Sequence, residues 1–234
     1  MRLDNRSDYQ LRPVHFENNP LRFSQGSVLI STGLTKVICT ATVEEKTPKF
    51  LAGSGKGWIT AEYYMLPGST SPRVSRDNQR KGRSQEISRL IGRSLRASIN
   101  LQDLGEITIT IDCDVIQADG GTRTASITGG FVALSLAVKQ MLDSGSLDAL
   151  PTITPIAATS VGIFGDKVLV DLCYEEDSKA DADFNMVMAS DGGIVEIQGS
   201  AEGNRFSRKL VDQVLDAGVD AISKLFELQF KALE

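Results

Sequence analysis

Apolar and polar residues alternate strictly over residues 106–117, which is the clearest local pattern in the chain. Isoleucines, a cysteine and a valine fall on one face, and threonines and aspartates fall on the other. A period of two over this length predicts a strand with one buried face. Shorter runs of strand-like residues predict further strands at 26–31, 36–43, 157–163, 167–174, 183–189 and 194–199.

Helical spacing of apolar residues occurs in other segments. Apolar residues at 87, 90, 91 and 95 predict a helix over about 84–100. Residues 122–142 are apolar nearly all round, which predicts a deeply buried helix. A long amphipathic helix is expected at the C-terminal end, over about 210–226.

These elements predict an α+β (mixed α/β) fold. One domain is expected over residues 1–234, made of two similar βαβ-type halves at about 1–145 and 151–234, with the long helix last. A chain of 234 residues is long enough to bury a full core. No run of about 18 apolar residues is present and the first residues are polar, so we expect neither a membrane span nor a signal peptide.

The rare residues narrow the chemistry. Three cysteines stand far apart in strand-like surroundings, which favours buried thiols in a cytoplasmic protein over disulfides or a zinc site. The chain has one histidine, His15, so Ser-His-Asp and Cys-His catalysis are not expected. Any reaction must therefore depend on carboxylates, basic groups, backbone N–H groups or a bound ion.

The net charge of −5 conceals two segments of opposite sign. As a total, it argues against a nucleic-acid partner. Residues 166–191, however, carry eight acidic side chains against two basic ones, and residues 73–96 carry eight basic side chains against two acidic ones. The basic set consists of Arg73, Arg76, Arg80, Lys81, Arg83, Arg89, Arg93 and Arg96.

Arg89, Arg93 and Arg96 fall on one face of the predicted helix, at positions i, i+4 and i+7. A solvated polar face is the simpler interpretation of this stripe. Its basic residues are all arginine, whose planar guanidinium suits phosphate groups. We therefore interpret the stripe as a contact for a polyanion.

Residues 118–126 join the clearest strand to the buried helix. Two glycines let the backbone approach a ligand, and the helix start presents free N–H groups. Thr122, Thr124 and Ser126 add hydroxyls, and Arg123 adds a full charge. The alternative is a threonine-capped helix with an exposed arginine. We favour a site for inorganic phosphate or a phosphoryl group.

Asp177 and Asp183 flank an acidic loop and stand six residues apart. A solvated loop is the simpler interpretation. Strands that close the loop would bring both carboxylates together, where they would hold a Mg²⁺-like ion or share a proton. Either arrangement assists phosphoryl chemistry, and the residues alone leave the choice open.

Several separated strings carry a resemblance to a known family. The most specific are residues 114–126 (DVIQADGGTRTAS), 176–178 (EDS), 183–185 (DFN) and 196–203 (EIQGSAEG). Residues 6–8 (RSD) and 57–63 (GWITAEY) also match. Over its whole length the chain resembles the ribonuclease PH family of phosphate-dependent 3′-exoribonucleases, which trim transfer-RNA precursors.

The resemblance implies a site and a co-substrate. Inorganic phosphate would be bound by Arg83, Gly121, Thr122 and Arg123. Asp177 and Asp183 would be the catalytic carboxylates and the ligands of a divalent metal, which we expect to be Mg²⁺.

It also implies partners. RNA, and not DNA, would be bound at the 3′ ends of transfer-RNA precursors, and the homo-oligomer would be a hexameric ring built as a trimer of dimers. The residues that would bind RNA or shape the ring are Arg73, Arg76, Arg89, Arg93 and Arg96.

Two departures from the family pattern concern the grip on distal RNA. The family usually has arginine after Met-Leu-Pro, where this sequence has Gly68. The loop between Arg76 and Arg83 is a few residues short. Phe184 stands where the family often has methionine, which is a tolerable apolar exchange.

Three other functions are consistent with parts of the sequence. A non-catalytic ring subunit that binds RNA should lack Arg123 or the aspartate pair, and a small-molecule phosphotransferase should have a nucleotide phosphate loop, which residues 53–57 do not supply. A hydrolytic nuclease would use water and would not need phosphate.

Overall fold

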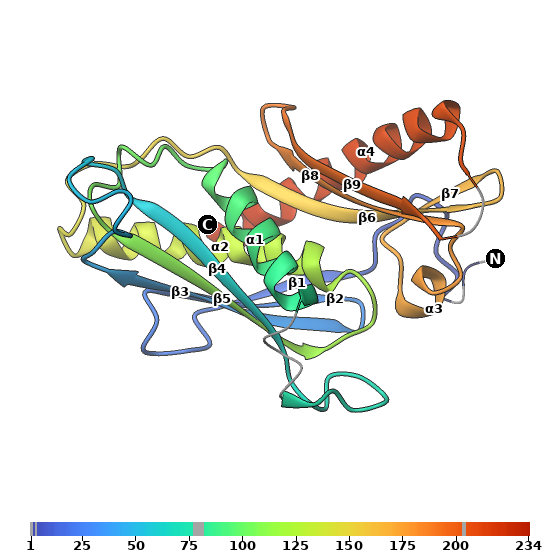
Figure 1. Ribbon diagram of the computed structural model, residues 1–234, viewed down its shortest axis with the longest axis horizontal. Helices are drawn as coiled ribbons and strands as arrows, with labels where there is room; N and C mark the ends of the chain where they lie inside the picture. Colours follow the sequence, from blue (N-terminus) through green and yellow to red (C-terminus); the bar gives the residue numbers. More distant parts are fainter. Residues whose placement is uncertain (1, 3, 77–81, 203–204) are drawn as a thin grey trace.

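The computed structural model describes residues 2, 4–76, 82–202 and 205–234, in which two sheets form the framework (Figure 1). The first sheet has the strand order β1-β2-β3-β5-β4. Its strands pair antiparallel except β4, which runs parallel to β5. The bounds are β1 (Val14–Asn18), β2 (Gly26–Thr32), β3 (Thr35–Glu44), β4 (Trp58–Met65) and β5 (Thr108–Gln117).

The second sheet is antiparallel throughout, in the order β7-β6-β8-β9. Its central strand β6 has side chains buried on both faces, because helices pack on both sides of it. The bounds are β6 (Ile156–Phe164), β7 (Lys167–Val170), β8 (Ala182–Ala189) and β9 (Ile194–Ala201).

Helix α2 (Thr122–Asp143) lies between the two sheets, and α1 (Gly82–Arg96) lies beside it against β4. The C-terminal helix α4 (Arg208–Leu233) covers the other face of the second sheet. By length and composition α2 is apolar enough to cross a membrane, but 72% of its most apolar window is buried inside the protein. Its composition is therefore that of a core helix, and its side chains join the two halves into one interior.

The structure differs from the sequence-based expectation at several elements. Strand β4 was not expected, and β7 ends at Val170 rather than near 174. The next residues form a short helix, α3 (Tyr174–Asp177), in place of a loop between strands. Helix α1 stops four residues before the expected end, and α4 continues seven residues further.

The cysteine prediction is confirmed for two of the three thiols. Cys39 and Cys113 are buried and oppose each other across β3 and β5. The hydrogen bond with Cys113, together with burial, holds the pKa of Cys39 well above its ordinary value. Cys173 is only half-buried, at the start of α3.

Candidate active site

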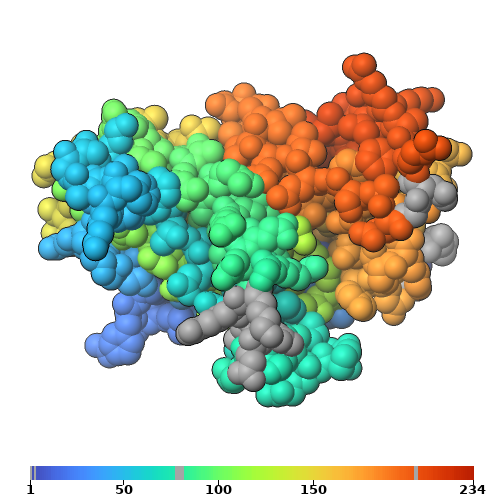
Figure 2. Space-filling model, viewed as in Figure 1, coloured from blue at the N-terminus to red at the C-terminus, as the bar shows by residue number. Residues whose placement is uncertain are grey.

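A cleft of about 320 Å³, open to solvent, lies where the start of α2 meets α3 and β8. All six residues predicted to bind phosphate or to supply the carboxylates line it, which places two distant parts of the sequence in one site. They are Arg83, Gly121, Thr122, Arg123, Asp177 and Asp183. A second hollow continues from it along β9 and shares Arg83, Arg123 and Asp183 with it. Figure 2 shows the two halves meeting in the middle of the molecule, with α1 in green against β9 in orange.

The first turn of α2 is built to receive an anion. Gly121 is its N-cap residue with φ of +64°, and the turn contains no acidic residue. The hydroxyls of Thr124 and Ser126 bond to helix carbonyls at 2.9 and 2.8 Å, so they are not the donors that the sequence suggested. Gly121, Thr122 and Arg123 line the cleft at the helix start, where the backbone N–H groups have no partner within the helix.

Tyr63 of β4 supports this turn from below. Its hydroxyl lies 2.8 Å from the Thr122 hydroxyl, and its ring is buried. Burial raises the pKa of Tyr63, while the bond with Thr122 and the charges of Arg83 and Arg123 act in the opposite direction. The phenol is therefore protonated at neutral pH, which leaves its proton available for the bond with Thr122.

The loop before α2 is pressed against the second half of the chain. A Cβ at Gly120 would lie 2.5 Å from the Leu172 carbonyl oxygen and 2.9 Å from the Tyr174 nitrogen. Thr35 holds the loop from the other side, donating to the Gly120 carbonyl at 2.7 Å and accepting from the Asp119 N–H at 2.9 Å. Glycine is required here because the two backbones touch.

Arg12 ties this loop to the second sheet. Its guanidinium is buried and bonds to both Asp171 carboxylate oxygens, at 3.1 and 2.7 Å. It also donates to the carbonyl of Asp119. A buried arginine shared between the two halves fixes how the phosphate end of the cleft faces the carboxylate end.

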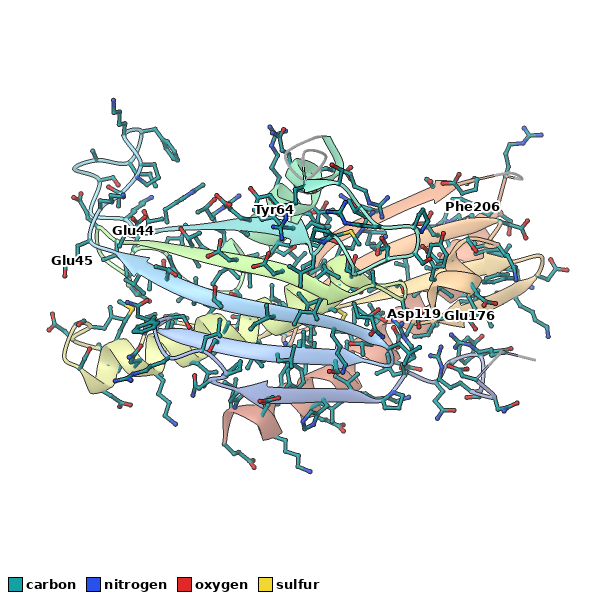
Figure 3. All side chains as sticks on the ribbon, turned by 90° about the horizontal axis from the view of Figure 1, so that it is seen from below. Glu44, Glu45, Tyr64, Asp119, Glu176 and Phe206 are labelled. Carbon is teal, nitrogen blue, oxygen red and sulfur yellow. The ribbon has the colours of Figure 1, made fainter. Side chains whose placement is uncertain are left out.

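Arg2 fixes α3 in a similar way. It forms two bonds with the Glu176 carboxylate, at 2.8 and 2.7 Å, and both side chains are buried. Burial by itself raises the pKa of Glu176, but the bonds from Arg2 and from the Cys173 N–H outweigh it and hold that pKa below its ordinary value. Figure 3 shows Glu176 near Asp119, whose carboxylate accepts from the Tyr174 N–H at the start of α3, so this clamp fixes the helix that carries Asp177.

One of the two catalytic candidates, Asp177, lies in surroundings that disfavour its charged form. Burial and the negative charge of Asp183 raise the pKa of Asp177, whereas Arg123 and Arg83 lower it. Asp183 and Asn185 project from the same face of β8 into the cleft. Sequence reasoning missed Asn185, although the strand period of two places it beside Asp183.

The aspartate pair is suited to a divalent cation that takes its remaining ligands from the substrate and from water. Among the described residues no group of three or more His, Cys, Asp or Glu side chains is arranged to hold a metal alone. Mg²⁺, however, commonly uses one or two carboxylates together with substrate phosphates and water. Asp177 and Asp183 fit that pattern, with the phosphate supplied by the substrate.

Arg83 lies in the first turn of α1, where no acidic residue accompanies it. A positive charge at a helix N-terminus opposes the helix dipole, so this position is unfavourable in the absence of a nearby anion. Asp177 offsets part of this cost, and a phosphate bound in the cleft would offset more of it.

The arginines predicted to bind RNA do not all lie on one free surface. Arg93 pairs with Glu196 of β9, and Arg96 lies 4.2 Å over the Trp58 ring. Arg89 is exposed and forms no ion pair within the described residues. Arg73 and Arg76 are exposed in the loop before α1, whereas Arg80 and Lys81 lie outside the described residues.

A chain of contacts missed by the sequence connects α1 to the phosphate end of the cleft. The Arg93 Nε lies 2.6 Å from Glu196, and the Gln198 side-chain amide donates to Glu196 at 2.9 Å. Arg123 in turn donates to the Gln198 oxygen at 3.4 Å. Glu196 and Gln198 belong to the string 196–203, but their spacing alone indicated no role for them.

Comparisons with known proteins cover the whole chain. The model for domain 1 of the 3′ exoribonuclease family matches residues 10–140, and the model for domain 2 matches residues 154–221. A ribonuclease PH of Crocosphaera subtropica is 54% identical over 233 residues, which is 99% of this chain and 97% of that protein. A ribonuclease PH of Bacillus cereus is 50% identical over 237 residues, 100% of this chain and 97% of that protein.

Solved structures share the fold. Rice (Oryza sativa) Rrp46 superposes with a TM-score of 0.80 at 19% identity, covering 100% of both chains. An Archaeoglobus fulgidus exosome structure with RNA bound to the active site superposes with a TM-score of 0.81 at 24% identity, covering 97% of this chain and 91% of the other. At these identities the likeness is one of fold.

Proposed function

The chain belongs to the 3′ exoribonuclease family, and from this premise we propose that its cleft removes 3′-terminal nucleotides from RNA by phosphorolysis. The products are a nucleoside 5′-diphosphate and an RNA shorter by one nucleotide. The observation that carries the proposal is the convergence in one cleft of two arginines, a helix N-terminus and an aspartate pair. A phosphate-binding group and a group that assists a leaving oxygen are the two parts that this reaction needs.

Phosphate needs positioning more than activation, because it is already partly dianionic near neutral pH. Arg83 and Arg123 neutralise it, and the first turn of α2 with the Thr122 hydroxyl orients its oxygens. One phosphate oxygen then attacks the last phosphodiester phosphorus, in line with the departing 3′ oxygen. The new bond is a phosphoanhydride, so the reaction runs backwards when diphosphates are abundant.

The departing 3′ oxygen acquires negative charge and must take a proton. Asp177, whose pKa is raised by burial and by Asp183, is suited to hold a proton at this end of the cleft. A divalent cation bound by the pair, when present, supplies charge stabilisation to that oxygen. The residues themselves support both arrangements.

RNA approaches along the exposed arginines, Arg73, Arg76 and Arg89, which contact its phosphates. No aromatic residue lies between 73 and 96, so recognition by this segment depends on the RNA backbone and falls steeply with salt. We propose 3′ ends of transfer-RNA precursors as cytoplasmic substrates and a hexameric ring, a trimer of dimers, as the working assembly. Light scattering tests the assembly.

The test is to incubate 3′-extended RNA and Mg²⁺ with and without phosphate and to identify the released nucleotides. Diphosphates that form only with phosphate are expected. Monophosphates released in both samples would overturn phosphorolysis and support hydrolysis instead.

Variants connect the activity to the cleft. Arg123→Ala and Asp183→Asn should each slow turnover by about 100- to 1000-fold, as the loss of one aimed charge does. Arg22→Ala, an exposed arginine in the turn before β2, is the control and should keep wild-type activity. Normal phosphorolysis by Arg123→Ala would overturn the assignment of the phosphate site.

A further inference from the structure

Tyr174 is an exposed aromatic residue that lines the cleft. It leaves 62% of its surface in solvent, although it lies in the same cleft as Arg123 and Asp177. Within the described residues its ring stacks on no other ring and its hydroxyl forms no hydrogen bond. Singly exposed rings are ordinary on protein surfaces, so it is the position of this ring beside the charged groups of the cleft that points to a ligand.

The backbone that carries this ring is fixed. Its N–H donates to the Asp119 carboxylate at 3.2 Å, and its carbonyl accepts from the Ser178 N–H at 3.0 Å. The touching backbone of Gly120 holds it from the other side. The ring is therefore presented at a constant place relative to the start of α2, which is the predicted phosphate site.

The cleft lining divides into two kinds of surface. Arginines, aspartates and the α2 N-terminus form the charged kind, and Met65, Val74, Ala118 and Tyr174 form the apolar kind. A nucleotide has the same division, with a charged phosphate and a base whose π-face is apolar. The charged part of the lining is sufficient to bind inorganic phosphate. The apolar part would then contact the base of the nucleotide.

We propose that Tyr174 is the stacking platform for the base of the 3′-terminal nucleotide, which rests on the proposed phosphorolysis. The contact uses the π-face of the base, so it accepts all four bases and positions the last phosphodiester without selecting sequence. It adds a base contact to a site whose other recognition is of phosphates. A second copy of the chain covering Tyr174 is the competing occupant.

The test compares Tyr174→Ala, Tyr174→Phe and the control Phe23→Ala, an exposed aromatic outside the cleft. Each is assayed on RNA with an ordinary 3′-terminal nucleotide and on the same RNA with an abasic one. Tyr174→Ala should raise the KM for ordinary RNA about 5- to 150-fold, the range for loss of one stacked base. The KM of Tyr174→Phe and of Phe23→Ala for ordinary RNA should stay within about twofold of the wild-type value, since both variants keep an aromatic ring at position 174.

Two further readouts separate stacking from a merely structural role. The KM for phosphate should be unchanged in Tyr174→Ala, because the arginines and α2 are untouched. The abasic end should weaken wild-type binding by the same factor as the substitution and should weaken Tyr174→Ala no further.

An unchanged KM for RNA in Tyr174→Ala, or an equal abasic effect in both proteins, would overturn the stacking role. Diphosphates would still form in that case, so the proposed function would stand. A change of particle mass by light scattering in Tyr174→Ala alone would support the second copy and also overturn the stacking role. Absence of phosphorolysis by the wild-type protein would remove both proposals.

Discussion

A single methyl group at Gly120 should separate the two ends of the cleft. Gly120 has φ of +73°, and a Cβ there would lie 2.5 Å from the Leu172 oxygen, 2.7 Å from the Cys173 carbon and 2.9 Å from the Tyr174 nitrogen. All three are backbone atoms, which cannot rotate away as a side chain would. The segment leading into α3 must therefore move when Gly120→Ala is made.

The loss of unfolding free energy in Gly120→Ala has two parts. Holding an alanine in the left-handed region costs about 1–2 kcal/mol, and overpacking against backbone adds about 1–3 kcal/mol. The Leu172 oxygen must retreat by about 0.9 Å to reach the 3.4 Å at which ordinary contact begins. A displacement of about 1 Å at a catalytic group can cost about 100-fold in rate.

Gly145 provides a matched control. Its φ is +74°, and a Cβ there meets nothing within 4 Å. Gly145→Ala therefore carries the backbone cost alone. The difference in unfolding free energy between the two variants isolates the contact part, about 1–3 kcal/mol.

Urea unfolding at one fixed protomer concentration measures that difference, because assembly would otherwise shift the midpoint. Nucleoside diphosphate release measures the effect on activity. Gly120→Ala should lose about 100-fold in kcat and Gly145→Ala should lose little. Equal destabilisation of the two variants, or full activity of Gly120→Ala, would refute the reasoning that the touching backbones hold α3 in place.

Three other predictions follow from charge. Because burial and the charge of Asp183 make ionised Asp177 unfavourable in the folded protein, Asp177→Asn should raise Tm at pH 7, by about 2–4 °C for each kcal/mol of that penalty, while it abolishes phosphorolysis. A lower Tm in calorimetry would contradict this. A Cβ at Gly68 would meet nothing within 4 Å, so Gly68→Arg should be tolerated. It should tighten RNA binding and steepen the slope of log K against log salt concentration by about 0.7. Fluorescence anisotropy across a salt series measures that slope, and an unchanged slope would exclude a phosphate contact. Glu176→Gln should cost about 3–5 kcal/mol of unfolding free energy at pH 7 by leaving the buried Arg2 guanidinium without its carboxylate partner. The pKa of Glu176 is lowered in the folded state, so the stability difference between wild type and Glu176→Gln should be complete above pH 4.5, the ordinary pKa of a glutamate, and should shrink as the pH falls below it. A stability difference that does not change with pH in urea titrations would argue against the clamp.

The elements that the sequence predicted well are those with long, regular patterns. Residues 106–117 became β5 (Thr108–Gln117), and residues 122–142 became α2 (Thr122–Asp143). In both, local period and burial agree, so the pattern needs no knowledge of distant residues. Strand β4 was missed because Trp58 and Tyr64 put aromatic groups on its outer face, which obscures its period of two.

The site was predictable where chemistry is concentrated in short strings. The strings gave Arg123, Asp177 and Asp183, and all three line the cleft. The groups that position them were not predictable, because their partners are remote. Arg2 meets Glu176 from 174 residues away, and no local spacing indicates such a pair.

Arg93 shows the same limit on a helix. Spacing put it on one face with Arg89, but its partner Glu196 lies 103 residues away on β9. A helical wheel therefore describes which side chains share a face, and not which of them are already neutralised. Arg96, which lies over the Trp58 ring and donates to the Ile59 carbonyl, was likewise not foreseeable as a packing residue.

The opposite charges of residues 73–96 and 166–191 thus serve two purposes that the totals cannot distinguish. Asp171 and Glu176 are buried against Arg12 and Arg2, so two of the eight acidic residues among residues 166–191 hold the two halves together. Asp177 is different, because its neighbour Asp183 repels it and burial opposes its ionisation. A carboxylate kept in such surroundings lowers folding stability, and a role in the reaction accounts for its presence better than any structural role does.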